Sequence, residues 1–368
     1  MRKNKKVLIL HENIGFGHTK IAEVICRDIK ERFPDFNVLC TDVIGKDYPF
    51  IRFLIVKIYF FMINYVPFIW ELLHEKNNSS YINRFFINIF ISFMKRSYRD
   101  ILIDYKPDVI ISTYAFSAGV ASKLKDEGFK YKLIGLITDF SVHDYWIYDN
   151  IDYYCVPNKI AYKQLSKSVR KNKIIITGIP VKKDFFNKKD KNQLKNKLGF
   201  KINTPLIVIM GGGGGIGKIE EINSIIDKIN INCQRAIITG TNIKLFNKLI
   251  KTKNNNFTKI YKFVDNIDEF MDACDLIIGK AGGSFLSECI AKKISPIIYG
   301  SLPAQERNNA EFIFKNKIGY YPKNNEELKE LIIKLLKNKN YLNKYYKNIE
   351  KFSMDKASSK VLQLINNN

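Results

Sequence analysis

The sequence is short of the residues that build metal and disulfide centres. Only four histidines and six cysteines occur among 368 residues, and the cysteines form no CxxC pair and have no histidine at zinc-ligand spacing. No Asp-x-Asp cluster follows an expected strand, so no cation site is predicted. The scattered cysteines fit a reducing compartment, where they serve as small apolar residues.

Acidic residues are also scarce. The 36 Asp and Glu stand against 60 Lys and Arg, which gives a formal net charge of +24. This excess indicates an anionic partner: nucleic acid, anionic lipid or a phosphorylated substrate. The alternative is a compositional bias toward Lys, Asn and Ile that leaves much of the excess as solvated surface. With 46% hydrophobic residues, the chain is long enough for two domains with separate cores.

Long apolar runs are few. The run after MRKNKK has only four residues, too few for a signal peptide, and predicts a first strand. The exception is 50–73, which Arg52, Lys57 and Glu71 interrupt. Aromatic residues mixed with basic ones favour a surface in the headgroup region of a membrane. A buried helical pair and a transmembrane helix are the alternatives. The aromatic residues expected at this acceptor or membrane surface are Phe53, Tyr59, Phe60 and Trp70.

Short apolar strands alternate with helices along the rest of the chain. This alternation predicts an α/β fold with two doubly wound parallel sheets, whose ligands bind at the carboxyl ends of the strands. The expected strands are Val7–Leu10, Val109–Ser112, Leu133–Thr138 and Ile174–Thr177, then Leu206–Met210, Ala236–Thr239, Lys259–Val264, Leu276–Ile278 and Pro296–Tyr299.

The most informative segment is 279–309. Gly282 and Gly283 fall between a strand and a helix, where bare backbone N–H groups can meet phosphates at the positive helix end. Ser284 and Glu288 are one helical turn apart, so the carboxylate can accept from a ribose diol beside those phosphates. The pattern indicates a nucleotide-sugar site.

Two neighbouring segments complete that prediction. Gln305 and Glu306 are expected in the loop after the last strand, where they supply a donor and acceptors for sugar hydroxyls. Val264 is expected to end a strand, where its backbone N–H and C=O could read the edge of a uracil.

A glycine-rich loop, Gly211–Ile219, follows another strand. It nearly matches a P-loop, but Ile219 stands where Ser or Thr would hold magnesium. We therefore expect Gly212 and Gly213 to face a diphosphate at the start of the next helix. A P-loop NTPase and a purely structural turn are the alternatives.

The turn Gly15-Phe16-Gly17-His18 opens the first helix. A histidine there has its cationic form disfavoured, which keeps the imidazole able to take a proton from a hydroxyl nucleophile. The alternative is a capping or packing histidine.

Asp139 and His143 follow another strand, with Trp146 close behind. Asp139 is a second candidate base, and His143 and Trp146 are candidate acceptor contacts. The alternative is that Asp139 caps a turn and His143 packs on Trp146.

Taken together, these motifs resemble the monogalactosyldiacylglycerol synthases and the processive diacylglycerol β-glucosyltransferases, and more distantly the N-acetylglucosaminyltransferase that completes the peptidoglycan lipid precursor. The resemblance rests on GFGH, TDFSVHDYW, TGIP, the glycine loop, FVDN, AGGSFLSE and PAQERNN, between Val7 and about Phe314.

The resemblance implies the GT-B fold, with two Rossmann-like domains facing a central cleft. It implies an acceptor and membrane domain over 1–180 with an apolar insert at about 48–95, a UDP-sugar domain over 181–350, and a C-terminal helix over 351–368 that packs toward the first domain. Glu288 would hold the ribose, and Gly282, Gly283 and Ser284 would meet the diphosphate.

The implied function is that of an inverting hexosyltransferase. It would move glucose or galactose from a UDP-sugar to diacylglycerol or a glycosyl-diacylglycerol, as a peripheral enzyme at the cytoplasmic face of an anionic membrane. No cofactor and no nucleic-acid partner are expected. The alternatives are transfer of N-acetylglucosamine to a polyprenyl-linked lipid, a UDP-sugar 2-epimerase, and a non-enzymatic protein that binds polyanions or membranes.

Overall fold

A computed structural model describes residues 4–13, 16–48, 50, 81–252, 257–300, 304–338 and 345–366. The predicted membrane contacts Phe53, Tyr59, Phe60 and Trp70 lie outside these residues. The chain forms two compact units. The first comprises Met1–Pro180, Pro303–Gln305 and Lys356–Asn368, and the second comprises Val181–Leu302 and Glu306–Asp355.

The first unit is built on a parallel sheet of six strands in the order β2-β1-β3-β4-β5-β6. The inner strands are apolar and buried, as expected where helices cover a parallel sheet. The strands are β1 (Lys6–His11), β2 (Asn37–Asp42), β3 (Val109–Ser112), β4 (Lys132–Leu136), β5 (Tyr153–Val156) and β6 (Ile174–Ile176). The helices are α1 (Phe16–Arg32), α2 (Val43–Asp47), α5 (Tyr81–Tyr105), α6 (Ala115–Asp126), η2 (Asp144–Trp146), α7 (Lys159–Leu165), η3 (Lys171–Lys173) and α17 (Ala357–Asn366).

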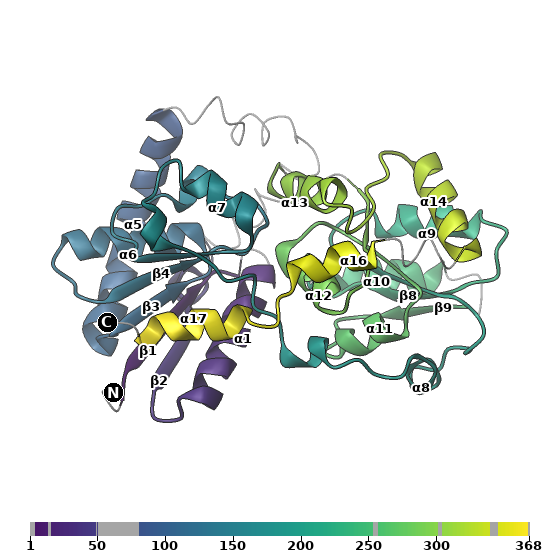
Figure 1. Ribbon diagram of the computed structural model, residues 1–368, viewed down its shortest axis with the longest axis horizontal. Helices are drawn as coiled ribbons and strands as arrows, with labels where there is room; N and C mark the ends of the chain where they lie inside the picture. The colour runs from purple at the N-terminus through teal and green to yellow at the C-terminus, as the bar shows by residue number, and fades with distance from the viewer. Residues whose placement is uncertain are drawn as a thin grey trace. The chain divides into compact units, whose positions relative to one another are not determined.

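The C-terminal helix α17 packs on the first unit, beside α1, as Figure 1 shows in yellow. Ser358 Oγ donates to Asp28 on α1 at 2.6 Å. Lys5 Nζ, just before β1, donates to the Ile365 carbonyl at 2.9 Å. The end of the chain is thus joined to its first strand and helix.

The second unit is built on a parallel sheet of five strands in the order β11-β10-β7-β8-β9. The strands are β7 (Leu206–Met210), β8 (Gln234–Ile238), β9 (Thr258–Tyr261), β10 (Leu276–Gly279) and β11 (Ile297–Ile298). The helical segments that follow Pro180 and precede α17 are η4 (Lys183–Phe186), α8 (Lys191–Lys197), α9 (Ile219–Asp227), α10 (Ile243–Lys251), α11 (Ile267–Ala273), α12 (Gly283–Ala291), α13 (Ala304–Lys315), α14 (Asn325–Lys337), α16 (Tyr346–Ile349) and η5 (Glu350–Phe352).

Two parallel sheets confirm the predicted fold class, with three corrections to the strands. The sequence patterns did not predict β2 or β5. The predicted strand Lys259–Val264 ends at Tyr261, so Val264 lies in the loop before α11.

A helix of 25 residues, α5, begins after residues 51–80, which lie outside the described residues and include most of the predicted apolar run 50–73. Its Ile91, Met94, Tyr98 and Leu102 are buried in the core of the first unit. Among the described residues, no helix combines the length and apolarity needed to cross a bilayer.

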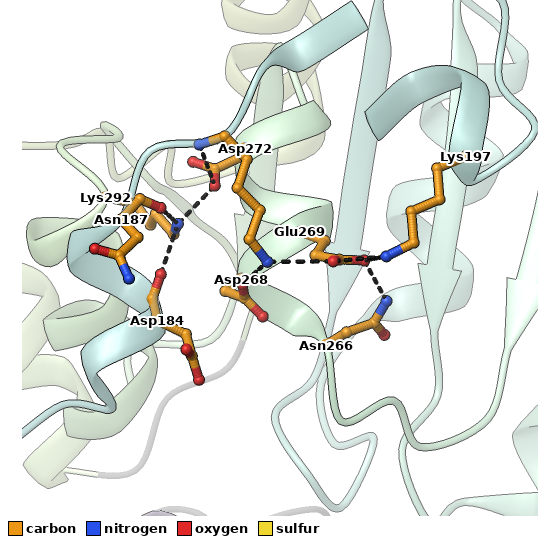
Figure 2. A network of polar contacts seen from close by, with 9 residues as sticks. Asp184, Asn187, Lys197, Asn266, Asp268, Glu269, Asp272 and Lys292 are labelled. Carbon is orange, nitrogen blue, oxygen red and sulfur yellow. Dashed lines mark hydrogen bonds and ion pairs between the residues drawn. The ribbon is translucent and has the colours of Figure 1, made fainter. Parts of the chain in front are cut away.

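A network of ion pairs holds the segment after Pro180 on α11 and α12 (Figure 2). Lys292, at the end of α12, donates to Asp272 Oδ2 at 2.6 Å and to the carbonyls of Asp184 at 3.1 Å and Asn187 at 2.8 Å. The Lys292 and Asp272 side chains are only 2% and 5% exposed. The charge pair is therefore buried, and removing one partner would leave the other as an uncompensated buried charge.

Glu269 on α11 is the centre of a second group in Figure 2. It accepts from Lys197 Nζ at 2.8 Å, from Lys189 Nζ at 3.2 Å and from Asn266 Nδ2 at 2.9 Å. Asn266 ends the loop that carries Val264, so these contacts also fix that loop to α11.

Replacing Asp272 with Ala will leave the Lys292 ammonium buried without its counter-charge. We expect the free energy of unfolding to fall by about 3–5 kcal/mol, measured by urea denaturation of the second unit. Glu311→Ala removes an exposed partner of Lys315 and is expected to cost less than about 1 kcal/mol. Equal losses for the two variants would contradict this account of the network.

Candidate functional site

The loops at the carboxyl edge of the second sheet meet where the strand order reverses. From β7 the chain proceeds to β8 and β9 on one side, whereas β10 and β11 lie on the other side. Ligands of doubly wound sheets bind at such a switch point. The loops that follow β7 and β10 carry the two predicted phosphate-facing glycine pairs, so the topology brings both to one place.

The glycine loop after β7 has a fixed conformation. Gly212, Gly215 and Gly217 have positive φ angles of 67°, 58° and 115°. A Cβ on Gly215 would lie 1.9 Å from the Thr239 carbonyl, so only glycine fits there. The Gly213 carbonyl accepts from the Thr241 N–H at 2.9 Å, which fixes the loop to the end of β8.

Ile219, at the position where a P-loop has its magnesium-binding hydroxyl, is the first residue of α9 and is 2% exposed. It belongs to the core of the second unit. Its role here is packing, which disfavours the P-loop alternative.

The loop after β10 leads directly into α12. Gly282 is the N-cap of that helix, and no side chain caps it. Ser284 Oγ donates to Glu288 Oε1 at 3.2 Å, as the spacing of one helical turn predicts. Glu288 is 7% exposed. A nearly buried carboxylate therefore lies one turn from a helix N-terminus whose N-cap residue, a glycine, supplies no side-chain acceptor to the helix N–H groups.

Sequence reasoning missed Lys280 in the same loop. Its Nζ lies 2.5 Å from Glu306 Oε1, and the two side chains are 24% and 12% exposed. A Cβ on Gly212 would lie 3.3 Å from Lys280 Cε, and one on Gly282 would lie 3.9 Å from both Cε and Nζ. The sequence signal was a lysine between a strand and a glycine pair, and it was obscured by the many other lysines.

Gln305 and Glu306 lie in the first turn of α13, which corrects their predicted position in a loop. The helix is held close to the glycine pair because Asn309 Nδ2 donates to the Ala281 carbonyl at 3.0 Å. The ion pair with Lys280 places the Glu306 carboxylate at the switch point. Val264 lies elsewhere on this edge of the sheet, after β9, two strands from β7.

His18 lies at the corresponding switch point of the first sheet, between β1 and β3. Its Nδ1 is 2.9 Å from the Thr113 carbonyl, just after β3, and 2.8 Å from Thr138 Oγ1, after β4. Because a carbonyl only accepts, this contact assigns the proton of the neutral ring to Nδ1. Nε2 then has the lone pair that a general base needs.

Asp139 follows Thr138 directly and is half-buried. His143 is also half-buried, and its ring centroid lies 6.4 Å from that of Trp146. Trp146 is 2% exposed and belongs to the core of the first unit. Its predicted place at an acceptor or membrane surface is therefore wrong, because packing against the sheet removes it from solvent.

Comparison with known proteins gives a match for each half of the chain. The family model of monogalactosyldiacylglycerol (MGDG) synthase matches residues 18–181, and that of the glycosyltransferase family 28 C-terminal domain matches residues 206–363. The chloroplast MGDG synthase of Spinacia oleracea is 29% identical over 89% of this chain and 65% of its own length. The processive diacylglycerol β-glucosyltransferase of Bacillus licheniformis is 26% identical over 98% of this chain and 94% of its own length.

The chain is thus similar, over most of its length, to glycosyltransferases of diacylglycerol. The resemblance predicted from its motifs is confirmed by these matches. Two solved structures share the fold: MurG of Acinetobacter baumannii (TM-score 0.59, 13% identity, 98% of this chain and 99% of that one) and a putative UDP-N-acetylglucosamine 2-epimerase of Listeria monocytogenes (TM-score 0.65, 14% identity, 98% and 95%). At these identities the likeness concerns the fold alone, which is of the GT-B type.

A buried acid that directly follows β1 was also missed by sequence reasoning. Glu12 follows β1, is fully buried, and accepts from Tyr98 Oη at 2.5 Å and from Ser117 Oγ at 2.9 Å. The Ile44 N–H donates to its other oxygen at 3.2 Å. Tyr98 lies on α5, so this carboxyl group joins α5 to the end of β1.

Glu12 shares its pocket with a second carboxyl group, Asp42. Burial, and then a hydrogen bond to Asp42, raise the pKa of Glu12 well above its ordinary value. Burial also acts to raise the pKa of Asp42, but hydrogen bonds from Glu12 and from the N–H groups of Gly45 and Asn13 outweigh it, so the pKa of Asp42 is lowered. Glu12 is therefore the protonated member of the pair and Asp42 the ionised member.

Among the described residues, no group of three or more His, Cys, Asp or Glu side chains is placed to hold a metal ion. The family members named above are sugar transferases, and the donor sugar is a substrate rather than a resident cofactor.

Replacing Glu12 with Gln removes a titration. Between the ordinary pKa of Glu and the raised one, the unfolded chain has lost a proton that the folded chain keeps, so wild-type stability falls as pH rises. Gln does not titrate. We therefore expect the unfolding free energy of E12Q, minus that of the wild type, to increase steadily from about pH 5 upward.

Urea unfolding of the first unit at several pH values measures this difference. The unfolding free energies of the two proteins are also expected to differ by an amount that does not change with pH, because the Gln amide would face the Ile44 N–H. The quantity to compare is therefore the slope of unfolding free energy against pH. Identical slopes for the two proteins would mean that Glu12 is ionised in the folded chain.

Proposed function

We propose that this glycosyltransferase moves a hexose, glucose or galactose, from a UDP-sugar to diacylglycerol or a glycosyl-diacylglycerol. The observation that carries the proposal is the combination of two matches in one chain. The half that contains His18 matches MGDG synthase, and the half that contains Glu288 matches the C-terminal domain of family 28. Of the proteins named above, one is a monogalactosyldiacylglycerol synthase and one a diacylglycerol β-glucosyltransferase.

The donor would bind at the switch point of the second sheet. The N–H groups of Gly212, Gly213, Gly282 and Gly283, with the start of α12, are suited to an anionic diphosphate. Glu288, oriented by Ser284, would accept from the ribose hydroxyls in a setting where water competes little.

The rest of the donor would lie on the flanking elements. Gln305 and Glu306, in the first turn of α13, would bind the hexose hydroxyls. The backbone of Val264 would read the uracil, in a loop held by Asn266 and Glu269. This position is two strands from β7, which suits the far end of an extended nucleotide.

His18 is the residue we propose as general base. Its Nε2 would take the proton of the acceptor hydroxyl as that oxygen attacks the anomeric carbon. The bond from the anomeric carbon to the diphosphate oxygen breaks, UDP leaves with the electron pair, and the configuration inverts. The Nδ1–H contact with Thr113 orients the ring for this step. Asp139 stays the second candidate, since it adjoins Thr138 in the same cluster.

The acceptor would come from a membrane to which the apolar insert binds. We propose that segment 48–95 lies at the cytoplasmic face of an anionic membrane, where the basic excess of the chain contributes to binding. His143 would contact the acceptor from the neighbouring loop. Neither a cofactor nor nucleic acid is part of this proposal.

The experiment is to incubate the purified protein with liposomes that contain diacylglycerol and with labelled UDP-glucose, UDP-galactose and UDP-N-acetylglucosamine, then identify products by mass. Hexosyl-diacylglycerol supports the proposal. An aminosugar on a polyprenyl lipid would support that alternative, and an epimerised free nucleotide sugar would support a 2-epimerase, whose fold solved epimerases share. Binding to polyanions without any product would indicate a non-enzymatic protein.

Replacing His18 with Ala is expected to lower kcat about 100-fold or more, because the acceptor hydroxyl loses its base. Thr138→Val is the matched control: it removes the Thr138 hydroxyl contact to Nδ1 and keeps the contact with the Thr113 carbonyl, so the loss should be much smaller. Rates are measured in the liposome assay at saturating donor. A H18A rate close to wild type would transfer the role of base to Asp139.

Replacing Glu288 with Ala is expected to weaken UDP binding about 10-fold or more, because a nearly buried charged acceptor for the ribose is lost. Calorimetry with UDP measures the affinity, and liposome flotation is expected to show unchanged membrane binding. Glu311→Ala, on the exposed face of the same unit, is the control. Unchanged UDP affinity in E288A would remove Glu288 from the donor site.

A further inference from the structure

Lys280 occupies the point where the two glycine loops of the second unit meet. It is the first residue after β10, and β10 pairs with β7 at the switch point. A Cβ on Gly212 or on Gly282 would lie within 4 Å of its terminal carbon, so the side chain extends along both loops. Its charged end is therefore adjacent to the two sets of backbone N–H groups that suit a diphosphate.

The hydrogen bonds of Lys280 differ from those of the buried structural lysines in the same unit. Lys292 is 2% exposed and donates to one carboxylate and two carbonyls. Lys195 is 4% exposed and also has three acceptors. Lys280 is 24% exposed, and among the described residues its hydrogen-bond acceptor is Glu306. An ammonium group has three donors, so Lys280 keeps capacity for a ligand.

The ion pair also gives Glu306 a defined position. Glu306 lies in the first turn of α13, and its Oε1 is held 2.5 Å from Lys280 Nζ. A ligand with a phosphate next to a sugar would meet the lysine with the phosphate and the glutamate with the sugar hydroxyls. The Lys280 side chain would thus contact the phosphate and also position the glutamate that binds the sugar.

We propose that Lys280 is a donor-binding residue whose ammonium group contacts the diphosphate of the UDP-sugar while its ion pair with Glu306 holds that carboxylate toward the hexose. The inference rests on the proposed function of this site. Lys280 would add a full positive charge to a diphosphate site that otherwise consists of backbone N–H groups and a helix N-terminus. A lysine suits this position because it binds phosphate as a compact point charge.

The test compares the binding of UDP and of UMP by calorimetry in the full chain. Lys280→Met keeps the length of the side chain and removes its charge. UDP affinity is expected to fall about 10- to 100-fold, the usual range for a charged hydrogen bond to a ligand. The loss for UMP is expected to be much smaller, because its single phosphate cannot span both loops.

Two further variants make the test specific. Lys280→Arg restores the charge, and its UDP affinity should lie between those of the wild type and K280M. Lys315→Met makes the same charge change on the exposed part of α13, where Lys315 pairs with Glu311, and should bind UDP as the wild type does.

The outcomes separate this inference from the proposed function. If the wild type binds UDP and transfers sugar but K280M keeps UDP affinity within about twofold of wild type, Lys280 does not contact the donor and only the inference fails. Equal losses of affinity for UDP and UMP would also overturn the inference, since they would show that Lys280 does not act through the diphosphate. A wild type that shows no UDP binding would overturn both.

Discussion

The parallel pairing of β10 with β7 is the constraint on which the rest of the second unit depends. These strands are far apart in the sequence, and their register sets Gly279 beside Met210, so the two glycine loops leave the sheet side by side. Every polar group assigned to the diphosphate or ribose follows from this juxtaposition. The β1–β3 pair does the same in the first unit, where it brings His18 against Thr113. A doubly wound sheet thus builds each site at the point where its strand order reverses.

Three pairs of ionisable side chains are stabilised in different ways. Lys292 and Asp272 are held as a buried pair that fixes the segment after Pro180. Glu12 and Asp42 share a pocket by keeping one group protonated, since two carboxylates would repel each other there. Lys280 and Glu306 are paired but partly open to solvent. This last arrangement leaves a cation partly accessible, as a binding site for an anion requires.

Much of the fold could be predicted from the sequence, because buried parallel strands are short apolar runs. Val109–Ser112 and Leu206–Met210 were predicted at their observed bounds. The edge strand β2 was missed because it is half-exposed and its polar residues interrupt the apolar pattern. Val264 was misplaced since an apolar run continues past the last residue that pairs with β8.

The site was predictable where spacing along one helix decides it, as for Ser284 and Glu288. The site was not predictable where segments distant in the sequence meet. The role of Lys280 depends on its contacts with Gly212 and Glu306. The pKa of Glu12 depends on Tyr98 and Asp42, which the sequence does not place beside it. Trp146 shows the opposite error, since an aromatic residue in a polar motif turned out to be a core residue.

The most direct test of the central claim is a crystal structure of the chain with UDP. We expect the diphosphate to lie against the glycine loops that follow β7 and β10, with the ribose hydroxyls on the Glu288 carboxylate. UDP bound elsewhere in the chain, or a ribose that does not touch Glu288, would contradict the account.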